Sequence, residues 1–199
     1  MIGEVVFGEV VSIVIACCMF VLFATAGIHK LNDRQTFLAT LNDYRLVPPS
    51  ITPMLSFIVP ILEACLALLW IFQLLQTLTA IISASLLSIY TLAIAINLAR
   101  GRTHIDCGCN FSAVGETGSL ISPALLLRNS LLILAILGTL LPTAPRELVW
   151  LDYATIIVTT LVAVIFYIST SQLLANKTAI ATWISHFCAD TPICSGPRH

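Results

Sequence analysis

The sequence predicts an all-α integral membrane protein, a bundle of four to five transmembrane helices with one interfacial amphipathic helix. Hydrophobic residues make up 58% of the 199 residues and charged residues only 10%, whereas a soluble domain carries about 25% charged residues. Several apolar runs are long enough to cross a hydrocarbon core of roughly 30 Å, which takes about 20 helical residues. One polar stretch between these runs has its apolar residues at helical spacing.

The five apolar runs define one transmembrane domain, residues 1–175, followed by a polar tail, residues 176–199. Glutamates and no lysine or arginine precede the first run, so we expect a retained helix rather than a cleaved signal peptide. Only a short polar interval separates the second run from the third, which predicts a tight helical hairpin. The predicted spans lie at about 8–28, 51–71, 75–98, 123–141 and 151–174.

The amphipathic helix is expected after the first span, where the chain turns polar from His29 to Ser50. Apolar residues recur there every three or four positions among charged ones, the pattern of a helix that lies in the membrane interface. Pro48 and Pro49 end this helix. Pro60, inside the second span, frees a backbone carbonyl that a neighbouring helix must satisfy, which favours a packed bundle over separate helices.

The loop at residues 99–122 carries the side chains best suited to chemistry. Cys107 and Cys109 are separated by one glycine, whose backbone freedom helps to close a small, labile disulfide ring. Three basic residues just upstream lower a thiol pKa and favour the attacking thiolate. We therefore predict a redox-active dithiol, with Cys107 and Cys109 as catalytic residues. The supporting basic residues are Arg100, Arg102 and His104.

Other interpretations of this cysteine pair stay open. The two residues could form a structural disulfide, remain inert thiols, or bind a metal ion together with His104. A closed zinc site needs four ligands and this loop offers three, although copper(I) accepts fewer. We assign no metal site.

A second cysteine pair, Cys188 and Cys194, lies in the polar tail. An odd number of spans puts this tail on the same side of the membrane as the Cys107 loop, so the two pairs could exchange disulfides as a relay. Alternatively, the second pair only forms a structural disulfide that stabilises the tail. The other three cysteines lie in apolar runs, where a thiol acts as a small hydrophobe.

Ionisable and amide residues near the loop complete the candidate site. Glu63 lies well inside the second span, and a charge at membrane depth is costly enough to suggest a function. We expect Arg128, about one turn into the fourth span, to be its partner, either as a structural ion pair or in proton transfer. Asn97 and Asn129 flank the loop, where they orient it or cap helices. Lys30 is expected to be an interfacial anchor.

With these residues in place, the chain resembles the MauE family, the membrane proteins of methylamine utilisation, which are related to DoxX-like proteins. The resemblance covers roughly residues 20–140 and rests on several separate motifs in the same order. At one point the chain departs from the pattern, because Asn110-Phe111 stands where the family has Phe-Gly after the second cysteine. The motifs are Gly27-Ile28-His29-Lys30-Leu31, Phe37, Tyr44-Arg45-Leu46-Val47-Pro48, Pro60-Ile61-Leu62-Glu63, Arg100-Gly101, Asp106-Cys107-Gly108-Cys109 and Leu127-Arg128-Asn129.

The resemblance implies a function in disulfide formation during maturation of the small subunit of methylamine dehydrogenase. The implied partner is a thioredoxin-like periplasmic protein, MauD-like, and the simplest electron acceptor in the lipid bilayer is a quinone. A non-enzymatic membrane assembly factor for the same client and a metal-handling membrane protein are the alternative functions. Nucleic acid is excluded as a partner, because the net charge is −1 and the basic residues are scattered.

Two arguments about orientation in the bacterial inner membrane disagree. Most basic residues outside the spans, including those of the Cys107 loop, fall on one side, which the positive-inside rule makes cytoplasmic. Disulfide chemistry requires the opposite, because cytosolic thiols are kept reduced. We follow the chemistry and the resemblance and expect a periplasmic loop.

Overall fold

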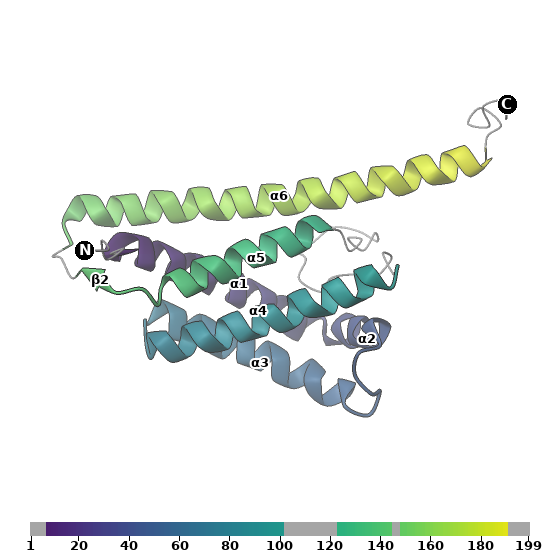
Figure 1. Cartoon of the computed structure of the whole chain (residues 1–199), viewed down its shortest axis with the longest axis horizontal. Coiled ribbons are helices and arrows are strands. Elements are labelled where there is room, and N and C mark those ends of the chain that lie inside the picture. Colours follow the sequence, from purple (N-terminus) through teal and green to yellow (C-terminus); the bar gives the residue numbers. More distant parts are fainter. Residues whose placement is uncertain (1–6, 102–122, 145–147, 191–199) are drawn as a thin grey trace, which may run out of the picture.

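The computed structural model describes residues 7–101, 123–144 and 148–190. Within this part of the chain, six helices carry nearly all of the structure (Figure 1). Two short strands pair in parallel and hold the start of the first helix beside the segment before the last one. The elements are β1 (Phe7–Gly8), α1 (Glu9–Asn32), α2 (Arg34–Tyr44), α3 (Thr52–Ile71), α4 (Gln76–Ala99), α5 (Pro123–Gly138), β2 (Thr143–Ala144) and α6 (Trp150–Asp190).

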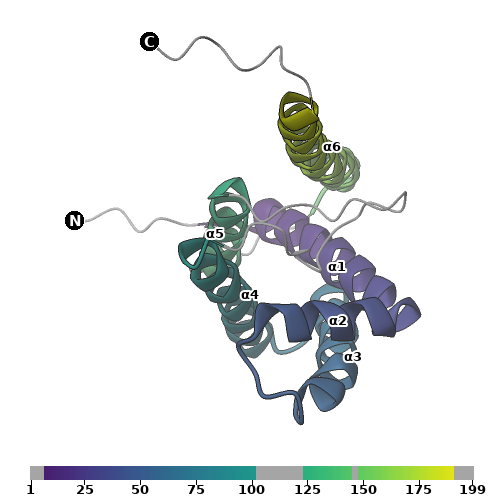
Figure 2. The ribbon, with the colours of Figure 1, turned by 90° about the vertical axis from the view of Figure 1, so that its right-hand side faces the viewer.

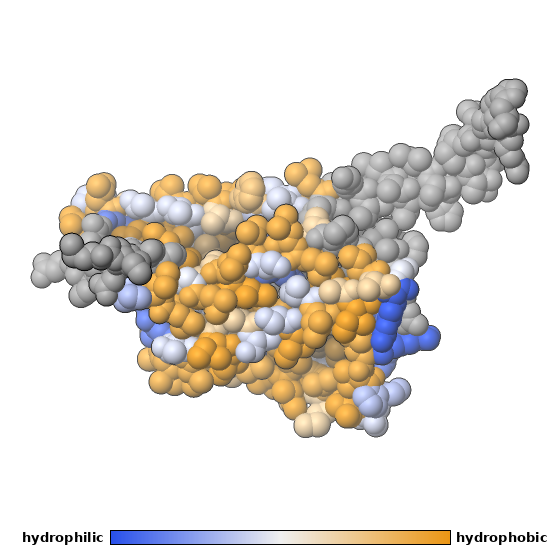
Figure 3. All heavy atoms as spheres, in the orientation of Figure 1, coloured by the Kyte–Doolittle hydropathy of each residue, from blue (hydrophilic) through white to orange (hydrophobic). Residues whose placement is uncertain are grey.

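The helices confirm an all-α membrane protein that crosses the bilayer several times. Helices α1, α3, α4 and the first 24 residues of α6 are long and apolar enough to span a membrane. Helix α5, with 16 residues, is about 24 Å long and ends three residues earlier than predicted, because the chain turns at residues 139–141. On the face that Figure 3 shows, apolar residues cover most of the described surface, and hydrophilic residues gather at the end where α2 lies.

Helix α6 continues well beyond the span predicted to end at residue 174. It has 41 residues and is therefore about 62 Å long, roughly twice the thickness of a hydrocarbon core. Neither glycine nor proline interrupts residues 150–190, so the helix does not stop where the composition becomes polar. The polar tail predicted from residue 176 is helical as far as Asp190, and α6 extends past the end of the bundle (Figure 1).

The core of the bundle is built on α1. This helix packs along α3 on one side and along α6 on the other, while α5 packs against α4. Phe23 of α1 and Leu66 of α3 are almost completely buried in this core, as is Ile136 of α5. Helix α2 crosses the end of the bundle, and α6 stands outside it beside α1 (Figure 2).

Helix α2 confirms the predicted amphipathic helix. Phe37, Thr40 and Tyr44 are buried, at the three- and four-residue spacing of one helix face. Asp33 caps the start of α2 by accepting a hydrogen bond from the Thr36 amide at 3.1 Å, and hydrogen bonding from Thr36 lowers the pKa of Asp33.

Side-chain hydrogen bonds tie α2 to the start of α3. The Arg34 guanidinium donates to Ser56 Oγ at 3.2 Å, and Thr52 Oγ1 donates to Asn42 Oδ1 at 2.9 Å. Both Thr52 and Ser56 are buried. The amphipathic helix is therefore fixed over the ends of α1 and α3 by polar contacts as well as by its apolar face.

The tight hairpin between α3 and α4 is also confirmed. Gln73 and Leu75 adopt positive φ angles of 51° and 48° in the connection, which reverses the chain within a few residues. Next to this turn, Trp70 Nε1 donates a hydrogen bond to Ser83 Oγ at 3.0 Å, and both side chains are buried. A small serine on α4 thus accepts the only donor of a large aromatic side chain on α3.

Candidate functional site

The candidate site begins where α1 and α3 come closest together. A Cβ atom added to Gly27 would lie 3.1 Å from the Pro60 carbonyl oxygen and 3.3 Å from the Ala64 nitrogen. Both of these atoms belong to a backbone that cannot easily move aside, so a glycine is needed here. The close approach brings the next turn of α1, which carries Lys30, against the turn of α3 that carries Glu63.

An ion pair joins these two turns inside the bundle. Lys30 Nζ lies 2.5 Å from Glu63 Oε1, with 2% and 1% of the two side chains exposed. Tyr90 Oη of α4 donates to the same carboxylate oxygen at 2.7 Å. The Lys30 ammonium also lies 4.8 Å from the centre of the Tyr90 ring and 5.1 Å from that of Phe37, within the range of cation–π attraction. We call this group of four residues the buried charge cluster: Lys30, Phe37, Glu63 and Tyr90.

The buried charge cluster lies inside the apolar runs of α3 and α4 and next to the end of α1, where α2 covers it. Tyr90 precedes the end of α4 by nine residues, which is about 14 Å along the helix and close to half of a 30 Å hydrocarbon core. Each ion costs several kcal/mol to bury, so the two charges need each other. Glu63 Oε2 has no hydrogen-bond partner within the described part of the chain, and this oxygen keeps a free acceptor position.

Two expectations about charged residues are wrong. Lys30, and not Arg128, is the partner of Glu63, and Lys30 is buried rather than an interfacial anchor. The reason is the position of α2, which folds over the end of α1 and places Phe37 against the ammonium group.

Arg128 instead connects α5 to α6. Its Nη1 donates to Ser171 Oγ at 3.1 Å, and its guanidinium carbon lies 5.1 Å from the centre of the Tyr167 ring. The neighbouring Asn129 is buried, and its Oδ1 lies 3.5 Å from Arg128 Nη2. Arg128 Nε is buried and has no hydrogen-bond partner among the described residues.

The ends of α4 and α5 flank the segment that carries Cys107 and Cys109. Asn97, two residues before the end of α4, is fully buried and donates to the Ala93 carbonyl at 3.0 Å, so it is not a cap. Asn97, Ile94 and Tyr90 are spaced by three and four residues, which puts them on one face of α4. The buried charge cluster thus shares one face of α4 with Asn97, near the end of the helix.

Most of the predicted redox residues lie outside the described part of the chain. This holds for Cys107 and Cys109, for the supporting Arg102 and His104, and for Cys194. Arg100 follows the last turn of α4 and is exposed. Cys188 belongs to α6, which runs toward the same end of the bundle at which α4 ends (Figure 1), and its side chain lies outside the described features.

The structure adds Lys30 and Tyr90 to the residues of the site. A signal for Lys30 was present, because a lysine one turn after a helix-packing glycine lies on the same face as that glycine. Tyr90 shares a face of α4 with Asn97, but nothing in the sequence indicates that this face meets Glu63.

Taken together, the fold and the cluster define a multi-pass, all-α membrane protein whose bundle is closed around a buried lysine–glutamate pair. The family model described as methylamine utilisation protein MauE matches residues 8–142, which include the whole cluster, the cysteine segment and Arg128. The chain belongs to this family of methylamine utilisation proteins.

Curated relatives with the same description support the assignment. The methylamine utilization protein MauE of Paracoccus denitrificans is 32% identical over 168 residues, which cover 79% of this chain and 88% of the relative. That of Paracoccus versutus is 35% identical, covering 76% of this chain and 81% of the relative. The protein of Methylorubrum extorquens is 33% identical, and the match covers 68% of this chain and 73% of the relative. No solved structure matches the chain.

Proposed function

We propose that this protein is a membrane thiol–disulfide redox protein that supports disulfide formation in the small subunit of methylamine dehydrogenase. Membership of the methylamine utilisation family supports the pathway, and the Cys107-Gly108-Cys109 sequence supports the chemistry. The structural observation that supports the proposal is the buried charge cluster, which includes Tyr90 of α4, the helix that directly precedes the cysteine segment in the chain. A membrane bundle keeps such a costly group where function requires it.

The proposed reaction moves two electrons in each of two steps. In the first, the Cys107–Cys109 disulfide accepts two electrons from the dithiol of a thioredoxin-like, MauD-like periplasmic protein. The partner becomes a disulfide, and the protein's two cysteines become thiols through a mixed disulfide. In the second, the two thiols give two electrons and two protons to a quinone, which leaves as the quinol. Arg100, Arg102 and His104 favour the thiolate that each exchange requires.

The buried charge cluster contributes in two ways to this function. The ion pair and the Tyr90 hydrogen bond hold α1, α3 and α4 in register, which fixes the end of α4 from which the cysteine segment starts. The unpartnered Glu63 Oε2 also offers a transient acceptor for one of the two protons that pass from the dithiol to the quinone. Cys188 and Cys194 are the proposed second pair of the relay.

Single serine variants test the redox function. Cys107→Ser and Cys109→Ser should each abolish oxidation of the thioredoxin-like partner in proteoliposomes. Alkylation of the thiols that remain on the partner measures this oxidation. Cys65→Ser, which removes an exposed thiol from α3, is the matched control and should leave the rate unchanged. Retained partner oxidation in either loop variant contradicts the mechanism.

A second experiment tests the proposed orientation in the inner membrane. Alkaline phosphatase fused after residue 115 should be active, and green fluorescent protein fused there should be dark, because the proposed loop is periplasmic. A fluorescent fusion without phosphatase activity would place the loop in the cytoplasm and rule out the oxidase function.

A non-enzymatic assembly factor is the second candidate function. The geometry of the buried charge cluster favours this function, because Glu63 Oε1 of α3 contacts both Lys30 of α1 and Tyr90 of α4. Such contacts hold three helices together without any chemical reaction. Growth on methylamine restored by a Cys107→Ser/Cys109→Ser double variant would select this alternative over the redox function.

A further inference from the structure

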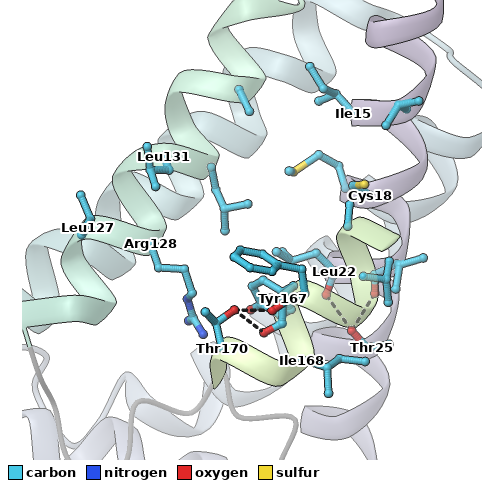
Figure 4. A pocket seen from close by; sticks show the side chains of 18 of the residues that line it. Ile15, Cys18, Leu22, Thr25, Leu127, Arg128, Leu131, Tyr167, Ile168 and Thr170 are labelled. Atoms are coloured by element: carbon cyan, nitrogen blue, oxygen red, sulfur yellow. Dashed lines mark hydrogen bonds between the residues drawn. The ribbon is translucent and has the colours of Figure 1, made fainter. Parts of the chain in front are cut away.

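A cavity of about 580 Å³ lies between α1, α5 and α6. Its volume falls within the roughly 300–1,000 Å³ typical of small-molecule sites. Helix α6 packs along α1 and leaves this space on the side of α5 (Figure 4). The walls are almost entirely apolar, as expected of a site for a ligand that arrives through the lipid. They include Ile15, Cys18 and Leu22 of α1, Leu131 of α5, and Phe166 and Tyr167 of α6.

Arg128 is the polar feature of this cavity. Figure 4 shows its side chain reaching from α5 toward Tyr167 and Thr170 of α6. A guanidinium group has five N–H donors and no acceptor, and the hydrogen bonds of Arg128 to Ser171 and Asn129 use one donor of Nη1 and one of Nη2. The two threonines that line the cavity are already engaged, because Thr25 donates to the Val21 carbonyl at 2.6 Å and Thr170 to the carbonyl of Phe166.

The cavity therefore suits a ligand with an apolar body and a hydrogen-bond acceptor at one end. An isoprenoid quinone has this chemistry, since its ring carbonyls accept hydrogen bonds and its tail dissolves in the bilayer. Phe166 and Tyr167 supply aromatic surfaces for a flat ring. Arg128 lies five residues, about 7.5 Å, after the start of α5, which directly follows the cysteine segment. The acceptor end of the ligand would thus lie toward that segment.

We propose that this cavity is the binding site for the quinone that reoxidises the cysteine dithiol, with Arg128 as the donor to a quinone carbonyl. The inference rests on the proposed redox function and names its electron acceptor and the position of its site. The step balances, because two thiols lose two electrons and two protons to become a disulfide, and the quinone gains them to become a quinol.

Quinone binding tests the site separately from thiol chemistry. The probe is decylubiquinone, added to the purified full-length protein in nanodiscs of phosphatidylcholine, with equilibrium binding measured directly. Ala163→Phe puts a phenyl ring into the cavity and should abolish binding. Val162→Phe, the neighbouring position on α6, is 61% exposed, does not line the cavity, and should bind as wild type does. Arg128→Leu should weaken binding about tenfold or more, because a charged hydrogen bond is lost.

The outcomes separate this inference from the proposed function. The site is supported if Ala163→Phe abolishes both quinone binding and quinol formation but leaves thiol exchange with the partner intact. A Cys107→Ser/Cys109→Ser variant should still bind the quinone, because the cavity does not depend on the thiols. If the wild type exchanges thiols with the partner but does not bind the quinone, the proposed binding site is wrong, whereas the proposed redox function is not contradicted. A co-purified phospholipid lost from Ala163→Phe, with quinone binding unchanged, identifies a lipid site and also overturns the inference.

Discussion

Removing the charge of Glu63 should destabilise the bundle far more than removing an exposed carboxylate. In Glu63→Gln, the buried Lys30 loses its counter-ion, and among the described residues its ammonium faces only neutral groups: the amide of the new side chain, Tyr90 Oη at 3.4 Å and two aromatic rings. Breaking a buried pair by removing one partner costs about 3–5 kcal/mol. That corresponds to about two to three and a half orders of magnitude in the folding equilibrium constant.

Replacing both members of the pair should recover most of this loss. A Lys30→Met/Glu63→Leu variant leaves no unpaired charge, and apolar replacements of buried ion pairs are often neutral or stabilising. Tyr90→Phe removes one hydrogen bond to Glu63 and should cost about 1 kcal/mol, because such bonds are modest in membrane bundles. We therefore expect the free energy of unfolding of the double variant to be near that of the wild type. That of Tyr90→Phe should be slightly lower, and that of Glu63→Gln should be much lower.

Reversible unfolding in mixed micelles with increasing dodecyl sulfate measures these differences. Fluorescence of the buried Trp70 reports the loss of packing between α3 and α4. Asp43→Asn, at an exposed position of α2, is the matched control and should change the free energy of unfolding by less than about 0.5 kcal/mol. If Glu63→Gln is no less stable than Asp43→Asn, the ion pair does not hold the bundle together and the reasoning fails.

Three further outcomes follow from particular contacts. Gly27→Leu should force α1 away from α3 and cost about 1–3 kcal/mol in the same unfolding assay, and unchanged stability would contradict the close approach. Ser83→Ala removes the acceptor of the Trp70 indole and should cost about 1 kcal/mol, measured in the same way. Because hydrogen bonding from Thr36 holds the pKa of Asp33 below its ordinary 3.8, the charged cap stabilises α2 above that pH and loses its effect as the pH falls through the lowered pKa. Asp33→Asn keeps an N-cap and should remove this acid dependence of amide hydrogen exchange in α2.

The membrane architecture could be predicted from the sequence because length and hydropathy decide it locally. A run of about 20 apolar residues has few stable alternatives to a spanning helix, so the bounds of α1, α3 and α4 lie within a few residues of the predicted ones. The spacing of apolar residues after α1 likewise indicated α2. Composition was a weaker guide at the end of α6, where the helix continues through polar residues that do not break it.

The sequence by itself determined which residues are unusual: a glutamate inside a span, a lysine at the end of another, an arginine near the start of α5, and two cysteines between α4 and α5. Only the tertiary structure decided how they pair. Helical periodicity tells which residues share a face, but not which faces meet or how deep each helix sits. The close contact at Gly27 and the cover provided by α2 bring Lys30 to Glu63, while Arg128 faces α6 and an apolar cavity. A charge pair inside a membrane depends on distances of a few ångströms between helices far apart in sequence, and packing sets those distances.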